Sequence, residues 1–487
     1  MLYDEKLALL QKPIRLEVIG KYLGQLLIIL ALLIILPLVV SLLYMEYDFT
    51  IRYVVVECIL FALGLLLIRI NTPAAIQTNE GLAITSLIFI ISPLIMTIPL
   101  MGSGLDFIDA LFEAASAFTT TGLSTATELQ HQPRTFLFTR TYMQWIGGLG
   151  IVVLTVALLI RPGRYLKKLI DLDESKGMAS STRTYARRIS VIYLALTVLC
   201  ISIIWAANGD FFDAVTHAFA AVSTGGFSNY DNSLAGFNSS VTTLCVILGC
   251  VFGALPLLLY FRIRQYNLLQ ICQDVQVRAL VFFILCISIL LAFALADSTD
   301  MPLSEVLFHA PLMVISAQTT AGFSSIDTLQ IGTHGMLILM IAMFVGGSLG
   351  STAGGIKIYR ILIFWSALQH MLQKSTATPH AVIEPHLAGG HLETEEINKA
   401  MLIILLFFFT IIFSWLAFLF SGYDPINSLF EVVSAVGTVG LSSGIISADL
   451  PTHLKLILCV DMLLGRLEFF ALLVLVYPLT WFNKRSA

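Results

Sequence analysis

Charged side chains are scarce in this sequence. Asp, Glu, Lys and Arg make up 12% of the 487 residues, against about 25% in ordinary soluble domains. Hydrophobic residues make up 57%, and the mean hydropathy is +0.90. A soluble surface needs more charge than this, so the composition excludes a secreted protein, a soluble enzyme and a nucleic-acid-binding protein. The net charge of −4 is too small to indicate a charged partner. The sequence therefore predicts a polytopic membrane protein.

The sequence contains no CxxC pair, and we expect no cleavable leader. None of its seven cysteines belongs to a CxxC pair, and all but Cys272 lie in apolar runs. We interpret them as small buried hydrophobic residues rather than as disulfides or metal ligands. The first apolar run, at about 23–45, follows a basic segment and is long enough to span a bilayer instead of being cleaved off.

Ten apolar stretches are long enough to be membrane spans. They cover approximately residues 23–45, 52–70, 81–101, 135–160, 189–207, 240–262, 277–296, 335–368, 397–420 and 453–482. Basic residues gather between spans four and five, after spans six and eight, and at the C-terminus, whereas the alternate connections are acidic or neutral. The positive-inside rule then predicts a protein of the cytoplasmic (inner) membrane with both termini in the cytoplasm.

One pentapeptide pattern, Thr-x-Gly-[Leu/Phe]-Ser, occurs four times and nowhere else in the chain. The copies lie at 120–124, 224–228, 320–324 and 438–442. Their glycines are 104, 96 and 118 residues apart, which indicates an internal repeat. The residues found thirteen positions before these glycines are all polar, namely Asp109, Asp213, His309 and Asn427. We expect each of them to cap a half-length helix of roughly 15 Å.

Each repeat therefore predicts a full span, a half-length helix, a polar glycine-containing strand and a second full span. The expected fold is an all-α polytopic membrane protein with four concatenated helix–pore-loop–helix units around one pore, preceded by an extra N-terminal helical hairpin. The expected boundaries are 1–75 for the hairpin and 76–170, 171–268, 269–375 and 376–487 for the four units.

The four irregular strands carry the functional prediction. Backbone that is neither helix nor closed barrel survives inside a bilayer only where it lines a polar cavity. The C-terminal ends of four half-helices would direct partial negative charge at that cavity, and strand carbonyls can replace the hydration shell of a cation. Four surface loops with turn glycines are the alternative, but surface loops have no need of the same five residues.

This arrangement resembles the Trk/Ktr/HKT superfamily of potassium transporters, and in particular its TrkH branch, because the N-terminal hairpin at 23–70 is present. The resemblance covers nearly the whole chain and places the family's filter glycine at Gly122, Gly226, Gly322 and Gly440. Glycine at all four places accompanies potassium selectivity in the family. Only Thr438-Val439-Gly440 is similar to a potassium-channel filter itself.

The resemblance implies which residues would hold potassium and which partners the chain would have. Potassium, as the transported ion, would bind carbonyls of the filter residues Thr120, Thr121, Gly122, Thr224, Gly225, Gly226, Thr320, Ala321, Gly322, Thr438, Val439 and Gly440. No tightly bound cofactor is implied. The implied partners are a second copy of the chain, a separate cytoplasmic nucleotide-binding subunit of the TrkA type and the lipid bilayer, with no nucleic acid.

The eighth span is interrupted by a glycine-rich segment at 346–355. Its glycines are Gly346, Gly347, Gly350, Gly354 and Gly355, and such a density disfavours a regular helix. Ile356 stands where a phosphate-binding loop needs lysine, so we reject that interpretation. We expect an intramembrane gate, as in TrkH-like proteins. Close packing of helices through small residues is the alternative, and it is our interpretation of the second such run, Gly147 to Gly150.

The tenth span carries Arg466 among apolar residues. A charge at membrane depth normally faces a cavity or a partner. Arg466 could pair with Asp461 or Glu468, or its guanidinium could lie beside the pore and slow cations by repulsion. TrkH-like proteins carry an arginine in the corresponding Gly-Arg-Leu-Glu run, which implies the second role.

The polar connection at 371–396 contains His380, Glu384, His386 and His391. A zinc site is conceivable there, but the spacing fits no pair of ligands on one helix. We therefore expect a solvated cytoplasmic loop.

The predicted function is potassium uptake through a channel-like pore, gated by the intramembrane segment and by a cytoplasmic partner. The alternative is an alternating-access, cation-coupled secondary transporter, whose repeats are typically inverted. Here each unit crosses the membrane an even number of times, so all units would be parallel. The motif HExxH is absent, which argues against an intramembrane metalloenzyme.

Overall fold

The structure is a computed structural model that describes residues 13–72, 76–158, 178–263, 273–378, 383–387 and 390–481. The described chain is almost entirely helical, with one pair of two-residue strands. Seven of its helices are long and apolar enough to cross a membrane. The expected all-α polytopic membrane fold is therefore confirmed. Residues 159–177, which hold part of the basic connection between the fourth and fifth expected spans, and His380 lie outside the described residues.

The helices follow one another with short connections. The first group is α2 (Leu16–Leu43), α3 (Tyr47–Ile68), α4 (Thr78–Leu100), α5 (Phe107–Phe118), α6 (Arg134–Leu158), α8 (Met178–Asn208), α9 (Phe211–Val222), α10 (Ser240–Ala254) and α11 (Leu259–Ile263). The second group is α12 (Val275–Ser298), α13 (Leu303–Gln318), α14 (Gly332–Val345), α15 (Ile358–Thr376), α16 (Thr394–Phe420), α17 (Pro425–Val436), α18 (Thr452–Arg466) and α19 (Phe470–Val476). Strands β1 (His386–Leu387) and β2 (Gly390–His391) join α15 to α16.

Three of the ten expected spans are interrupted. The sixth stops at Ala254, just before Pro256, which has no backbone N–H to continue a helix. The eighth is split into α14 and α15 by the glycine-rich segment, and the tenth into α18 and α19 at Glu468 and Phe469, which both have positive φ. Glycine density predicted the break in the eighth span, but apolar composition did not reveal the breaks in the sixth and the tenth.

The half-length helices α5, α9 and α17 begin three residues earlier than expected. Their N-cap residues are Asp106, Asp210 and Asp424, whose side chains accept backbone N–H groups of the first turn. Asp109, Asp213 and Asn427 lie inside that turn instead of capping it. The fourth such helix, α13, is longer and follows Pro302, so His309 lies well inside it. The predicted caps were therefore wrong, although the predicted helices are present.

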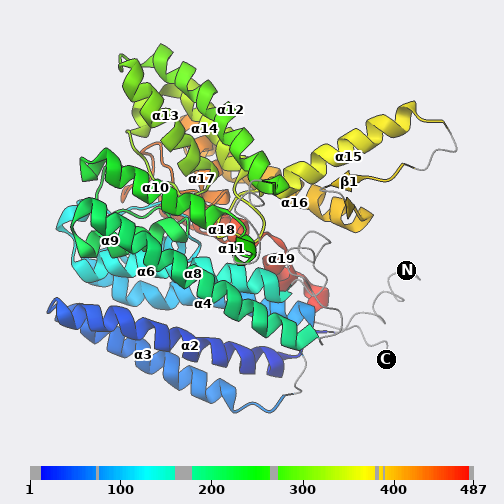
Figure 1. Ribbon diagram of the computed structural model, residues 1–487. Helices are drawn as coiled ribbons and strands as arrows, with labels where there is room; N and C mark the ends of the chain where they lie inside the picture. Colours follow the sequence, from blue (N-terminus) through cyan, green and yellow to red (C-terminus); the bar gives the residue numbers. More distant parts are fainter. Residues whose placement is uncertain are drawn as a thin grey trace.

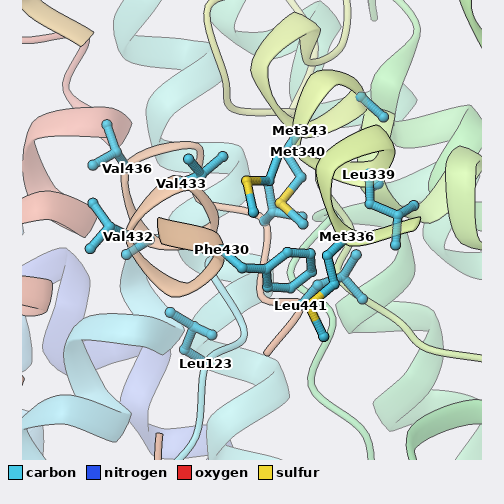
Figure 2. Close-up of a cluster of buried hydrophobic side chains, with 14 of the residues drawn as sticks. Leu123, Met336, Leu339, Met340, Met343, Phe430, Val432, Val433, Val436 and Leu441 are labelled. Carbon is cyan, nitrogen blue, oxygen red and sulfur yellow. The ribbon is translucent and has the colours of Figure 1, made fainter. Parts of the chain in front are cut away.

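Most residues of α5, α9 and α17 are buried among the other helices, and Figure 1 shows α2 and α3 side by side along one edge of the bundle. α15 extends away from the other helices (Figure 1). In Figure 2, Phe430 of α17 lies among methionines of α14, including Met336 and Met340. Because lipid tails are as apolar as these side chains, such contacts stabilise the bundle through close packing rather than through removal from water.

Candidate functional site

The four pentapeptide segments leave the helix ends in the same conformation. Each first threonine has a left-handed backbone: φ is 53° at Thr120, 53° at Thr224, 54° at Thr320 and 49° at Thr438. Positive φ is a genuine outlier for a β-branched residue and costs on the order of 1–3 kcal/mol at each position. Strain of this kind, repeated at four equivalent places, points to a functional constraint.

Backbone hydrogen bonds hold this conformation in all four segments. The N–H of the residue before each motif glycine donates to the carbonyl five residues earlier. These bonds run from Thr121 to Ser116 (2.9 Å), Gly225 to Ala220 (2.7 Å), Ala321 to Ser316 (2.9 Å) and Val439 to Ser434 (2.8 Å). The end of each half-length helix therefore determines the path of the segment that follows it.

The four motif glycines form a closed ring. All have positive φ, between 70° and 98°. A Cβ atom added to any of them would lie against the carbonyl oxygen of the next segment. The distances are 2.2 Å from Gly122 to Gly225, 1.9 Å from Gly226 to Ala321, 2.0 Å from Gly322 to Val439 and 2.1 Å from Gly440 to Thr121. Since real Cβ atoms essentially never come closer than 3.0 Å, only glycine fits this ring. The structure thus brings all twelve predicted filter residues into one place.

A second layer of side chains supports the segments beyond the ring. Each lies nine residues before a motif glycine and bonds to a residue two or three positions after it. Glu113 Oε1 accepts from the Ser124 hydroxyl (2.6 Å), His217 Nε2 lies 3.1 Å from Ser228 Oγ, Met313 Sδ accepts from Ser325 N (3.3 Å), and Glu431 Oε1 accepts from the Ser442 hydroxyl (2.7 Å). Side chains of three types, Glu, His and Met, thus hold the four segments from equivalent positions.

Helix α6 contacts both its own segment and the next one. Arg140 Nε lies 2.8 Å from Glu113 Oε2, and both side chains are buried. The Arg140 guanidinium also lies 3.9 Å from the centre of the Phe227 ring. Gln144 donates to the Gly225 carbonyl (2.6 Å). Our sequence reasoning missed Arg140 and Gln144, although two polar side chains within an apolar run were a usable signal.

Removal of the Arg140 charge is expected to destabilise the protein strongly. Arg140→Met leaves Glu113 buried without its partner, which costs about 3–5 kcal/mol. The control is Arg52→Met, which breaks the partly exposed pair with Asp48 (2.9 Å) and is expected to cost less than about 1 kcal/mol. Thermal unfolding of both purified variants in detergent measures the difference. Equal losses would contradict a structural role for the buried pair.

The glycine-rich segment lies directly against the ends of the half-length helices. Thr352 Oγ1 is 3.0 Å from both the Val222 and the Gly253 carbonyl oxygens. Gly354 N donates to Thr320 Oγ1 (2.7 Å), and Gly355 N donates to the Gly437 carbonyl (2.9 Å). The segment is therefore in contact with three of the four repeats, immediately next to the first threonines of the ring.

Several of its glycines are required by this position. Gly346, Gly350 and Gly355 have φ of 64°, 77° and 71°. A Cβ at Gly354 would lie 2.0 Å from Thr438 Oγ1, and one at Gly347 would lie 2.4 Å from the Ala353 Cβ. Glycine at these positions thus allows the segment to lie close to Thr438 and to fold back on itself at Ala353.

Arg466 is bound by carbonyl groups and not by a carboxylate. Its guanidinium donates to Thr352 O (2.7 Å) in the glycine-rich segment and to Gly147 O (3.3 Å) in α6. Within the described parts of the chain, it forms no ion pair. Asp461 instead accepts from the Ser414 hydroxyl (2.8 Å). Neither carboxylate considered as a partner in the sequence therefore bonds to Arg466.

Glu468 bonds to two other cations. It pairs with Lys357 (2.9 Å) and with Arg360, at the start of α15. These contacts join the break between α18 and α19 to the end of the glycine-rich segment. Arg466 and Glu468, although two residues apart, thus have separate roles.

Three glycines lie directly against the C-terminal ends of half-length helices. A Cβ at Gly147 would lie 2.1 Å from Phe118 O, one at Gly253 would lie 2.4 Å from Val222 O, and one at Gly465 would lie 1.9 Å from Val436 O. Each carbonyl belongs to the last residue of a half-length helix. The interpretation of Gly147 as a packing residue agrees with this geometry.

The polar connection between α15 and α16 is more ordered than expected. Glu384, His386 and His391 lie on or beside the β1–β2 pair, with their candidate ligand atoms within 4.8 Å of one another. The spacing fits no helical pair of ligands, but the antiparallel strand pair brings these residues together. His380 is outside the described residues.

Comparison with known proteins identifies the family. Residues 48–480 match the TrkH family, described as cation transport protein. The Trk system potassium uptake protein TrkH of Halomonas elongata is 33% identical over 487 aligned residues, covering 96% of this chain and 99% of that protein. TrkH of Escherichia coli is 30% identical, covering 83% of this chain and 86% of its own.

A solved structure has the same fold. The crystal structure of the potassium transporter TrkH from Vibrio parahaemolyticus superposes with a TM-score of 0.85 at 25% identity, covering 96% of this chain and 100% of that one. These relatives are transport proteins, so the expectation that the chain is not an enzyme is confirmed. The chain belongs to the TrkH family of cation transport proteins.

Proposed function

We propose that this protein takes up potassium ions through a channel-like pore whose narrowest part is the glycine ring. The observation that carries the proposal is the closed contact between each motif glycine and the carbonyl of the next segment. A ring of main-chain carbonyls is the arrangement that replaces the hydration shell of a cation. The names of the Halomonas and Escherichia relatives, both potassium uptake proteins, support potassium as the ion.

The half-length helices add to the cation preference. α5, α9, α13 and α17 all end immediately before the ring, and a helix C-terminus carries roughly half a negative charge. Four such ends favour a cation at the centre and disfavour an anion. In this proposal the units at 76–170, 171–268, 269–375 and 376–487 each contribute one helix and one segment.

The glycine-rich segment is the proposed gate of this pore. It bonds to the ends of α9 and α17 and to Thr320 of the ring, so its displacement would open the path below the ring. Arg466 donates to Thr352 in this segment, which puts a positive charge where it would slow a cation leaving the ring. Gate and charge would then act together.

The surroundings of the pore follow from the charge bias and the family. We place the protein in the cytoplasmic membrane with both termini inside, as a homodimer that binds a cytoplasmic nucleotide-binding subunit of the TrkA type. Ile14 N donates to Thr480 O (2.9 Å), so the two ends of the described chain lie on the same side of the bundle, as this orientation requires.

Ion flux through purified protein in liposomes tests the proposal. Potassium and rubidium are expected to move faster than sodium and lithium by about tenfold or more, which corresponds to at least about 1.4 kcal/mol of discrimination. Protein-free liposomes are the control. Equal rates for the four ions would contradict the filter. Potassium flux that requires a proton or sodium gradient would instead support alternating access.

A further inference from the structure

We propose that Glu384, His386 and His391 form a binding site for a divalent transition-metal cation such as Zn²⁺. The site lies on the connection between α15 and α16 and is independent of the proposed transport function. Their candidate ligand atoms all lie within 4.8 Å of one another.

The strand pair creates this proximity. His386 and His391 are directly opposite each other in the antiparallel β1–β2 pair, so their side chains emerge on the same face. Their ring centres are 5.9 Å apart, and Glu384 Oε2 lies 3.2 Å from His391 Nδ1. Three residues that are two, five and seven positions apart in sequence therefore converge on one point.

The donor set suits zinc. Two imidazoles and one carboxylate, with a fourth position for water, form a recurrent Zn²⁺ site with bonds of about 2.0–2.2 Å. Tetrahedral bonds of that length place the ligand atoms roughly 3.3–3.5 Å apart. The Glu384–His391 pair, at 3.2 Å, is already close to this spacing, and rotation of the exposed side chains can bring the third ligand atom to it.

One ligand is already oriented for binding. His386 Nδ1 donates to the Glu384 backbone carbonyl (2.7 Å), which leaves Nε2 with its lone pair free for a metal. A hydrogen bond from the second ring nitrogen to a carbonyl is the usual support for a metal-binding histidine, because it fixes both the tautomer and the ring orientation.

The backbone of the site is anchored, while its ligands remain accessible. Ser366 of α15 donates to the His386 carbonyl (2.9 Å), and Leu392 packs against Ile363 of α15 and Ala400 of α16. The side chains of His391 and Glu384 keep 33% and 55% of their surface exposed. An ion from solvent can therefore reach a site whose backbone is anchored to α15 and α16.

Zinc titration of the full-length protein, purified without a histidine tag, tests this inference. We expect one Zn²⁺ per chain in competition with a chromophoric chelator, and a rise in unfolding temperature with Zn²⁺, since a ligand that binds the native state stabilises it. His386→Ala and His391→Ala are each expected to weaken binding by at least about tenfold, and Glu384→Gln less, by analogy with the loss of one metal ligand. His131→Ala, an exposed histidine outside the cluster, is the matched control and is expected to bind as the unmodified protein does.

Cobalt substitution of the unmodified protein provides a second readout that needs no variant. A tetrahedral Co²⁺ spectrum that disappears on addition of Zn²⁺ supports the site even where an alanine variant fails to fold. Three results would overturn the inference. The first is zinc binding no tighter than that of a single exposed histidine. The others are unchanged binding in the His386→Ala/His391→Ala double variant and equal weakening of binding in the His131→Ala control.

Discussion

Gly122→Ser is expected to lower the ratio of potassium to sodium flux by about tenfold, equivalent to about 1.4 kcal/mol of lost discrimination. The new Cβ would start 2.2 Å from the Gly225 carbonyl oxygen, so this oxygen or the whole segment must move by about 1 Å to restore an ordinary contact. A displacement of that size alters the carbonyl cage on which ion preference depends. The flux ratio in liposomes, with each ion measured at equal concentration, is the readout.

Gly104→Ser is the matched control for this substitution. Gly104 has nearly the same backbone, with φ of 90° against 93° at Gly122, but nothing lies within 4 Å of its added Cβ. It therefore carries the backbone strain without the collision. An unchanged flux ratio in correctly folded Gly122→Ser protein would refute the ring, and so would the same loss in both variants.

The four pentapeptides made the central part of the site predictable from sequence. A repeated Thr-x-Gly pattern in four apolar units predicted that the four segments meet, and the glycine ring brings them together. The residue types also held information on conformation, because glycine is needed at φ of 70–98°. The strained threonines before them could not be predicted, since β-branched residues normally avoid positive φ.

Helix ends and long-range partners were less predictable. Asp106 and Asp109 are both good capping residues, and only the backbone path decides that Asp106 caps α5. Arg140 and Glu113 are 27 residues apart in sequence, and their pairing depends on how α5 packs against α6. For Arg466 the sequence suggested two carboxylate partners near in the chain, whereas packing brought it carbonyls from residues 352 and 147.

Arg466→Ala is expected to raise potassium flux severalfold or more. Two unit charges about 4 Å apart interact by roughly 4 kcal/mol at an effective dielectric constant of 20, and water in a pore reduces this value. Removal of the positive charge lowers that barrier. The loss of two charge-assisted hydrogen bonds, to Thr352 and Gly147, also frees the glycine-rich segment from α6 and α18. Both effects act in the direction of faster flux.

Arg360→Ala separates this barrier from a structural ion pair. Arg360 is also a buried arginine of this region, but it pairs with Glu468, so its removal leaves a carboxylate with only Lys357 as a partner and is expected to lower stability and flux together. The measurement is flux per folded protein beside thermal stability for both variants. Arg466→Ala should increase the flux per folded protein and change the thermal stability only slightly. Its partners are carbonyl groups, so its removal leaves no uncompensated charge. If Arg466→Ala instead behaves like Arg360→Ala, the guanidinium holds the fold together and the barrier must lie elsewhere along the pore.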